Sequence, residues 1–191
     1  MGFFTIGDKE ERLAKRLQGG DSSALRDFYT LFGDYLTGVC ARYISGEDDL
    51  KDVFQDALVQ IITHVKDFHY RGPGSLQAWA TRIVVNQSLR FLKEQRQHDW
   101  ERLSWEVADV PEEDDPPVRD IPPEVLQQMI RELPTGYRTV FNLYVFENKS
   151  HQEIAQLLGI GKDTSCSQFS RAKNLLAKKI TAYIQNKQHN T

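Results

Sequence analysis

The sequence predicts an all-α protein made of two small helical domains, and three observations support this prediction. Over most of the chain, apolar residues recur with the period of about 3.6 residues that is typical of amphipathic helices. The alternating pattern typical of strands is hardly found. A stretch rich in acidic residues and prolines separates two helical regions. We therefore expect one domain over residues 8–97, an extended acidic linker over 98–122 and a second domain over 123–187.

The first domain is predicted to be helical throughout. Its first helix ends at Gly19 and Gly20, and Asp21 and Ser22 are candidate caps for the helix that follows. The next helix, which begins near Asp48, is the clearest amphipathic segment of the chain. Its apolar stripe consists of Leu50, Val53, Phe54, Ala57, Leu58, Ile61, Ile62, Val65 and Phe68.

A further helix is expected after the segment YRGPGS, with Ser75 as its cap and its end near Gln97. The charge balance changes beyond it. Residues 101–124 hold nine acidic and two basic residues, whereas residues 125–191 hold nine basic and four acidic ones. The net charge of −3 excludes a uniformly basic surface for nucleic acid, but it conceals a basic C-terminal part.

Helices resume at Pro123 and are interrupted at Pro134. Ser150 and Glu153 have the spacing of a capping box, in which each side chain binds the other residue's amide. Gly159 fits the left-handed residue that ends such a helix, and another amphipathic helix follows it. This arrangement predicts a helix-turn-helix. The inward face of its second helix consists of Phe169, Ala172, Leu176, Ile180 and Tyr183.

The opposite face of that second helix is polar, and Gln168 and Ser170 are expected on its flanks. Its members are Thr164, Ser167, Arg171, Asn174 and Lys178. Lys173 is expected to reach phosphates. A face that combines hydroxyl, amide and guanidinium groups predicts contact with DNA.

Other classes of function are poorly supported. The five histidines form no HExxH, and neither Cys40 nor Cys166 belongs to a CxxC pair. We therefore expect no enzyme activity, no catalytic residues, no cofactor and no metal. Hydrophobic residues make up 40% of the chain, yet the sequence contains no uninterrupted run of about 18 of them, the length that a membrane-spanning helix needs. We accordingly expect no membrane insertion and a cytoplasmic location.

Taken together, the segments resemble the sigma factors of bacterial RNA polymerase, specifically the extracytoplasmic-function group. GDSSALRDFYTLFGDYL is similar to the first core segment of the N-terminal sigma domain, and DLKDVFQDALVQIITHVKDF is similar to its polymerase-binding helix. RGPGSLQAWATRIVVNQSLRFL is similar to its promoter-melting segment. The sequence from Leu133 to Leu176 is similar to the domain that reads the minus-thirty-five element.

The resemblance implies three sets of site residues, together with RNA polymerase core, promoter DNA and an anti-sigma factor as partners. The polymerase-binding set is Asp52, Gln55 and Asp56. The set for the melted minus-ten strand is Tyr70, Arg71, Arg82, Asn86 and Arg90, where the preceding loop forms a pocket for a flipped base. The set for the minus-thirty-five element is Thr164, Ser167, Gln168, Arg171 and Lys173.

Gln168 stands at a position where many members of the family carry a basic residue. Since glutamine pairs with adenine whereas arginine prefers guanine, this difference favours an A·T-rich minus-thirty-five element. The alternative function is an autonomous helix-turn-helix regulator, in which residues 1–97 form a dimerisation or effector domain. Such a regulator would bind a palindromic duplex tightly without polymerase.

Overall fold

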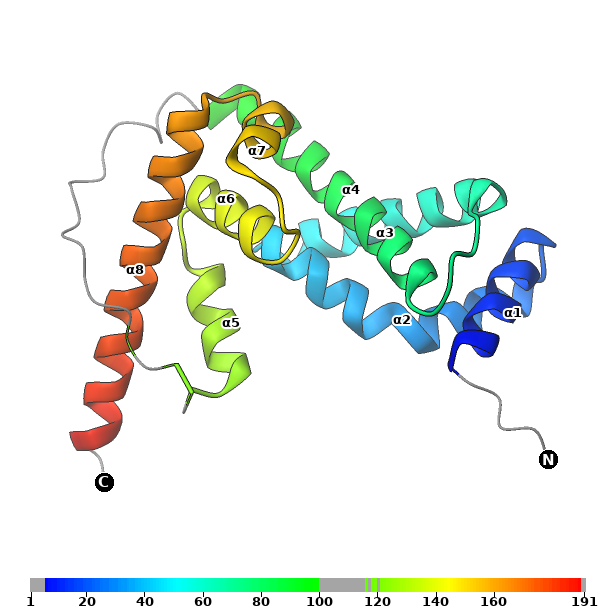
Figure 1. Cartoon of the computed structure of the whole chain (residues 1–191), viewed down its shortest axis with the longest axis horizontal. Coiled ribbons are helices and arrows are strands. Elements are labelled where there is room, and N and C mark those ends of the chain that lie inside the picture. Colours follow the sequence, from blue (N-terminus) through cyan, green and yellow to red (C-terminus); the bar gives the residue numbers. More distant parts are fainter. Residues whose placement is uncertain (1–5, 100–115, 117, 120, 190–191) are drawn as a thin grey trace. The chain divides into compact units, whose positions relative to one another are not determined.

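The computed structural model describes residues 6–99, 116, 118, 119 and 121–189, and the regular structure within them is helical (Figure 1). The prediction of an all-α protein is therefore confirmed. The described residues form two compact units that divide between Leu92 and Lys93. Most of the predicted linker, residues 100–115, 117 and 120, lies outside the described residues. None of the helices described is long and apolar enough to cross a membrane.

The first unit contains four α-helices and a short 3-10 helix, η1. They are α1 (Ile6–Gln18), α2 (Ser22–Tyr43), α3 (Glu47–His64), η1 (Val65–Asp67) and α4 (Ser75–Asp99), the last of which continues past the division between the units. Asp21 caps α2 as predicted, because its side chain accepts a hydrogen bond from the amide of Ser23.

The core of the first unit comes mainly from α2, α3 and α4. Its fully buried members include Phe28, Leu36 and Tyr43 of α2, Ile61 of α3, and Leu76 and Val84 of α4. The Cys40 sulfur lies 3.6 Å from the Ser88 hydroxyl, which brings α2 and α4 together. One prediction for the apolar stripe is wrong, since Ile62 is 43% exposed. It lies at the edge of the stripe, where the helix surface turns towards solvent.

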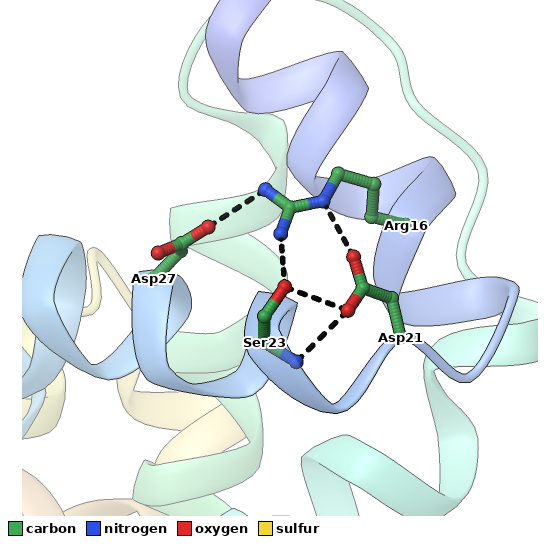
Figure 2. Close-up of polar contacts among 4 residues, drawn as sticks. All are labelled: Arg16, Asp21, Ser23 and Asp27. Atoms are coloured by element: carbon green, nitrogen blue, oxygen red, sulfur yellow. Dashed lines mark hydrogen bonds and ion pairs between the residues drawn. The ribbon is translucent and has the colours of Figure 1, made fainter.

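Arg16 joins α1 to the start of α2 (Figure 2). Its guanidinium donates to Asp21 over 2.8 Å, to Asp27 over 2.7 Å and to the Ser23 hydroxyl over 2.6 Å. Hydrogen bonds from Ser23 and from Arg16 lower the pKa of Asp21 to about 2. The planar guanidinium therefore links the end of α1 to the first turns of α2.

The second unit is arranged around the long α8 (Figure 1). Its helices are α5 (Pro123–Arg131), α6 (Thr135–Val145), α7 (His151–Leu158) and α8 (Lys162–His189). α8 packs against all three of the others. The central cluster consists of Ile121, Met129, Ile130, Leu133, Tyr137, Ala172, Leu176 and Ile180. Ile121 was expected in the linker, but its side chain belongs to this core.

A buried arginine connects α5 to α6. Arg138 is only 5% exposed, and its guanidinium donates to the carbonyl of Arg131 over 2.5 Å. The last carbonyls of a helix carry partial negative charge, so a cation at this position satisfies them. Lys179 of α8 forms an ion pair of 2.6 Å with Glu132, which lowers the pKa of Glu132.

Candidate nucleic-acid interface

The loop between η1 and α4 carries the first candidate site. It runs from Phe68 to Gly74, with Gly72 at φ 122° and Gly74 at φ 83°. Side chains with a Cβ atom rarely adopt such values, so these two glycines let the chain turn sharply back into α4. Pro73, which lies between them, fixes its own φ and stiffens the turn.

A cavity of about 330 Å³ lies between this loop and the first turns of α4. It is lined by Asp67, Phe68, His69, Arg71, Ser75, Ala78, Trp79 and Arg82. Phe68 and Trp79 form one wall, with ring centroids 5.2 Å apart and planes inclined by 47°. Trp79 is half-buried and contributes both to the packing and to the lining. His69 also lines the cavity, although it was not among the predicted site residues.

The cavity brings together only part of the predicted minus-ten set. Arg71 and Arg82 are both exposed and line it, Arg71 from the loop and Arg82 from α4. Tyr70 lines a different hollow, next to α1. Asn86 and Arg90 are exposed further along α4. The spacing of four between Arg82, Asn86 and Arg90 gives them one continuous face of that helix.

The cap of α4 differs from the predicted one. Ser75 is the first residue of the helix, and its hydroxyl accepts a hydrogen bond from the Arg71 amide over 3.2 Å. The amides that open α4 are instead satisfied by the carboxylate of Glu10, a buried residue of α1. This contact joins residues more than 60 positions apart, and no local sequence pattern could have indicated it.

The predicted polymerase-binding residues lie on one exposed face of α3. Asp52, Gln55 and Asp56 are all exposed, as is the apolar Val59 at 58%. Their spacing of three and four residues places them in one row along the helix. Carboxylate, amide and apolar groups thus share a single surface.

The second candidate site is the helix-turn-helix formed by α7 and α8. Its predicted capping box is confirmed, because the hydroxyl of Ser150 accepts from the Glu153 amide and the Glu153 carboxylate accepts from the Ser150 amide. The bonds from Ser150 lower the pKa of Glu153. Gly159 ends α7 in the left-handed conformation at φ 66°, as predicted.

An aromatic cluster fixes the position of α8 against the two preceding helices. Tyr144 stacks on His151 with ring centroids 4.7 Å apart, and it contacts Phe169 at 4.4 Å. The Nδ1 atom of His151 lies 2.9 Å from the hydroxyl of Ser165, which is fully buried at the start of α8. Because these contacts link α6, α7 and α8, the exposed face of α8 has a defined orientation within the unit.

The structure separates the predicted minus-thirty-five residues into three groups. Thr164, Ser167 and the half-buried Arg171 share the outward face of α8, in agreement with their spacing. Lys173 is exposed, but it follows Thr164 by about two and a half turns and lies on the other side of the helix. Gln168 is only 8% exposed, which contradicts its expected place on the flank of the polar face. Cys166 is half-buried.

Residues 28–98 match the sequence family Sigma-70 region 2, and residues 124–176 match the family Sigma-70, region 4. The two matches cover most of the chain in the order expected from the resemblance. The chain therefore belongs to the sigma-70 family of RNA polymerase sigma factors.

Relatives of this chain include the ECF RNA polymerase sigma-E factor of Haemophilus influenzae, with 25% identity over 90% of this chain and 95% of that protein. The ECF RNA polymerase sigma factor SigW of Bacillus subtilis is 25% identical over 87% of this chain and 94% of its own. The solved structure of CnrH in complex with the cytosolic domain of CnrY has a TM-score of 0.49 and 22% identity, and the match covers 92% of this chain and 99% of that chain.

This protein is a sigma factor of the extracytoplasmic-function group, which binds RNA polymerase core and directs recognition of promoter DNA. The alternative of an autonomous regulator is not favoured, because the residues assigned there to dimerisation match sigma region 2. Sigma factors are not themselves enzymes. Within the described residues, no group of three or more His, Cys, Asp or Glu side chains could hold a metal ion.

Proposed function

We propose that this sigma factor has three binding surfaces with separate roles. The exposed face of α3 with Asp52, Gln55 and Asp56 binds RNA polymerase core. The cavity between the loop and α4 receives an unpaired base of the minus-ten element. The outward face of α8 reads the minus-thirty-five element. The observation that carries the proposal is the cavity, because it combines aromatic rings and two arginines in a recess of suitable size.

The cavity has the chemistry required for a single base. Its volume of about 330 Å³ is at the lower end of small-ligand sites, which span roughly 300–1,000 Å³. Unpaired bases bind proteins by stacking on aromatic side chains and on guanidinium planes, and here Trp79, Arg71 and Arg82 offer both. The same arginines can neutralise the neighbouring phosphates. A duplex cannot present a base in this way, so the site selects melted DNA.

The outward face of α8 provides a weaker contact with duplex DNA. Thr164 and Ser167 offer hydroxyl groups, and Arg171 offers the guanidinium that pairs bidentately with guanine. The hydroxyl of Ser167 already donates to the carbonyl of Thr164 over 3.1 Å, which leaves its lone pairs to accept from a base or water. Gln168, on which the predicted adenine preference rests, is only 8% exposed and so does not belong to this face. The proposed preference for an A·T-rich element therefore loses its basis.

Selection of single-stranded DNA tests the role of the cavity. The full-length protein is mixed with RNA polymerase core and a pool of short single-stranded DNA oligonucleotides of randomised sequence, and the bound molecules are sequenced. The wild-type protein should retain oligonucleotides with a preferred base at one or more positions. Arg82→Ala should lower the affinity for those oligonucleotides at least about tenfold, since hydrogen bonds to charged groups contribute roughly 1.5–3 kcal/mol.

Arg26→Ala is the matched control, because Arg26 is an exposed arginine of α2 that does not line the cavity. It should leave both the affinity and the base preference unchanged. Equal losses in the two variants would show that Arg82 acts only through overall charge. An unchanged affinity in Arg82→Ala would remove the cavity from the proposed mechanism.

Two further properties belong to the same proposal. The chain acts in the cytoplasm, where polymerase core and promoter DNA are found, and it performs no catalysis of its own. An anti-sigma factor, which the resemblance implies, would inhibit it by covering the α3 face. A purified anti-sigma candidate should then compete with polymerase core for this protein, and simultaneous binding of both would exclude that mode of inhibition.

A further inference from the structure

Helix α1 contacts both ends of the loop that forms the base cavity. It lies outside residues 28–98, the part of the chain that matches sigma region 2. Its polar side chains nevertheless reach backbone carbonyls at the start of the loop and backbone amides at its end. These contacts come from two residues, Gln18 and Glu10, which are two turns apart on the same helix.

Gln18 holds the entry to the loop. Its side-chain amide nitrogen donates to the carbonyl of Phe68 over 2.6 Å and to the carbonyl of Val65 over 3.1 Å. Both bonds are partly buried, so water competes with them only weakly. Phe68 is the residue whose ring packs on Trp79 to form the cavity wall. The bond therefore fixes the backbone from which that wall projects.

Glu10 holds the exit from the loop. One carboxylate oxygen accepts from the amides of Leu76 and Gln77 at 2.8 and 3.2 Å, and the other accepts from the amide of Gly74 at 2.5 Å. Glu10 is 3% exposed. A negative charge at a helix N-terminus is favourable, and three amide donors offset the loss of hydration of the buried carboxylate. The contact thus orients both the first turn of α4 and the last residue of the loop.

α1 is itself held in place independently of the loop. The Arg16 guanidinium binds Asp21, Ser23 and Asp27 at the start of α2 (Figure 2). Leu13 and Ala14 are buried in the first unit. A helix held in this way can fix the positions of the backbone groups that its polar side chains bind. A mobile helix could not impose a shape on the loop.

We propose that Glu10 and Gln18 are positioning residues, which hold the loop of residues 68–74 in the shape that receives a base. The inference rests on the proposed function of the cavity. Neither side chain lines the cavity, so neither touches the nucleotide. Their effect is to keep Arg71 on the loop at a fixed distance from Trp79 and Arg82 on α4. Specificity for the base then depends on a helix outside the family match.

The two oxygens of Glu10 allow a substitution that acts on the loop more than on the helix. In Glu10→Gln the remaining oxygen can still accept from Leu76 and Gln77, which retains the cap of α4. The new amide group places a donor against the Gly74 amide, so the bond to the loop is lost. Gln18→Met keeps the side-chain length but removes the donor to Val65 and Phe68. Both changes conserve the volume of the side chain closely.

The experiment compares these two variants with the wild-type protein as full-length chains. Amide hydrogen exchange over residues 68–77 should be faster in both variants, and in Glu10→Gln the increase should centre on Gly74. In the presence of RNA polymerase core, the randomised single-stranded DNA pool should show a base preference that is about fivefold to tenfold weaker at one position. Binding to core itself should be unchanged, which a general loss of folding would not allow.

Glu11→Gln is the matched control, since it removes the same charge from the neighbouring residue, whose carboxylate forms a surface ion pair with Lys15. It should leave exchange and base preference as in the wild type. The inference is wrong if Glu10→Gln and Gln18→Met retain the full base preference while Arg82→Ala loses it. If the wild-type protein shows no preference, the proposed function of the cavity fails instead. Hydrogen exchange then decides alone whether Glu10 and Gln18 hold the loop.

Discussion

Gln168 offers the sharpest test of the geometry of the helix-turn-helix. Its side chain is 8% exposed, and its Oε1 atom is buried with no hydrogen-bond partner among the described residues. A glutamine that reads DNA would need that oxygen in solvent. We therefore predict that Gln168→Met makes the protein more stable and leaves its DNA preference unchanged.

The magnitude follows from the cost of an unsatisfied acceptor. Leaving a buried polar group without a partner costs about 1–3 kcal/mol, and Met fills a similar volume without any such group. The helix propensities of Gln and Met are nearly equal, so the backbone contributes little to the difference. A gain of about 1 kcal/mol should raise the Tm of the second unit by roughly 4–8 °C, as expected for a domain of this size.

Calorimetry of the full-length chain measures the effect, since the two units can unfold in separate transitions. Gln156→Met is the control, because Gln156 is exposed on α7 and its replacement should stay within about 0.5 kcal/mol of the wild type. Promoter binding with polymerase core gives the second measurement. A lower Tm in Gln168→Met, or a changed base preference in the minus-thirty-five element, would refute the reasoning.

Three other predictions follow from the structure. The double substitution of Gln55→Ala and Asp56→Ala should weaken binding to polymerase core about tenfold or more while duplex binding by α8 persists. Separate titrations with core and with duplex DNA measure the two affinities, and a loss of duplex binding alone would contradict the prediction. Because the folded-state pKa of Asp21 is lowered from 3.8 to about 2, its contribution to stability is present above pH 3.8 and is lost as the pH falls through about 2. Asp21→Asn retains a capping side chain but cannot ionise, so the free energy of unfolding of this variant should depend less on pH in that window. A pH dependence as steep as that of the wild type would count against the Arg16 cluster. Burial raises the pKa of the Cys40 thiol, so a maleimide should modify the half-buried Cys166 first in the folded protein; equal labelling rates, read by mass spectrometry, would disprove this.

Features that depend on neighbouring residues could be predicted from the sequence. The cap at Asp21, the capping box at Ser150 and the left-handed Gly159 each follow from interactions within one turn of the chain. Most of the apolar stripes were predictable for the same reason, because helical periodicity indicates which side chains face the core, although Ile62 at the edge of its stripe is exposed. These local rules were enough to establish the fold class and to place α8 after a tight turn.

Features that depend on distant residues could not be predicted in this way. Ser75 has the right identity for a cap, but a buried carboxylate from α1 takes that role. Gln168 has the right angle for the edge of the polar face, but packing of α8 on its neighbours covers it. Tyr70 and Arg71 are adjacent in sequence, yet they line different hollows. In each of these cases, tertiary contacts decide what local spacing leaves open.

The outward face of α8 combines the hydroxyls of Thr164 and Ser167 with Asn174, Arg171 and Lys178. Two cations are a weak basis for recognising duplex DNA alone. Phosphate contacts supply most of the affinity in protein–DNA complexes, and the near neutrality of residues 1–100 limits them in the first unit. A sigma factor does not need strong separate contacts, because both units belong to one chain that also binds polymerase. Once one contact forms, the other becomes intramolecular, and two weak contacts together give high affinity. A tighter α8 would instead hold the free protein on duplex DNA away from polymerase. Under the proposed roles, weak duplex reading by α8 and a base cavity that acts only on melted DNA would together make recognition conditional on polymerase.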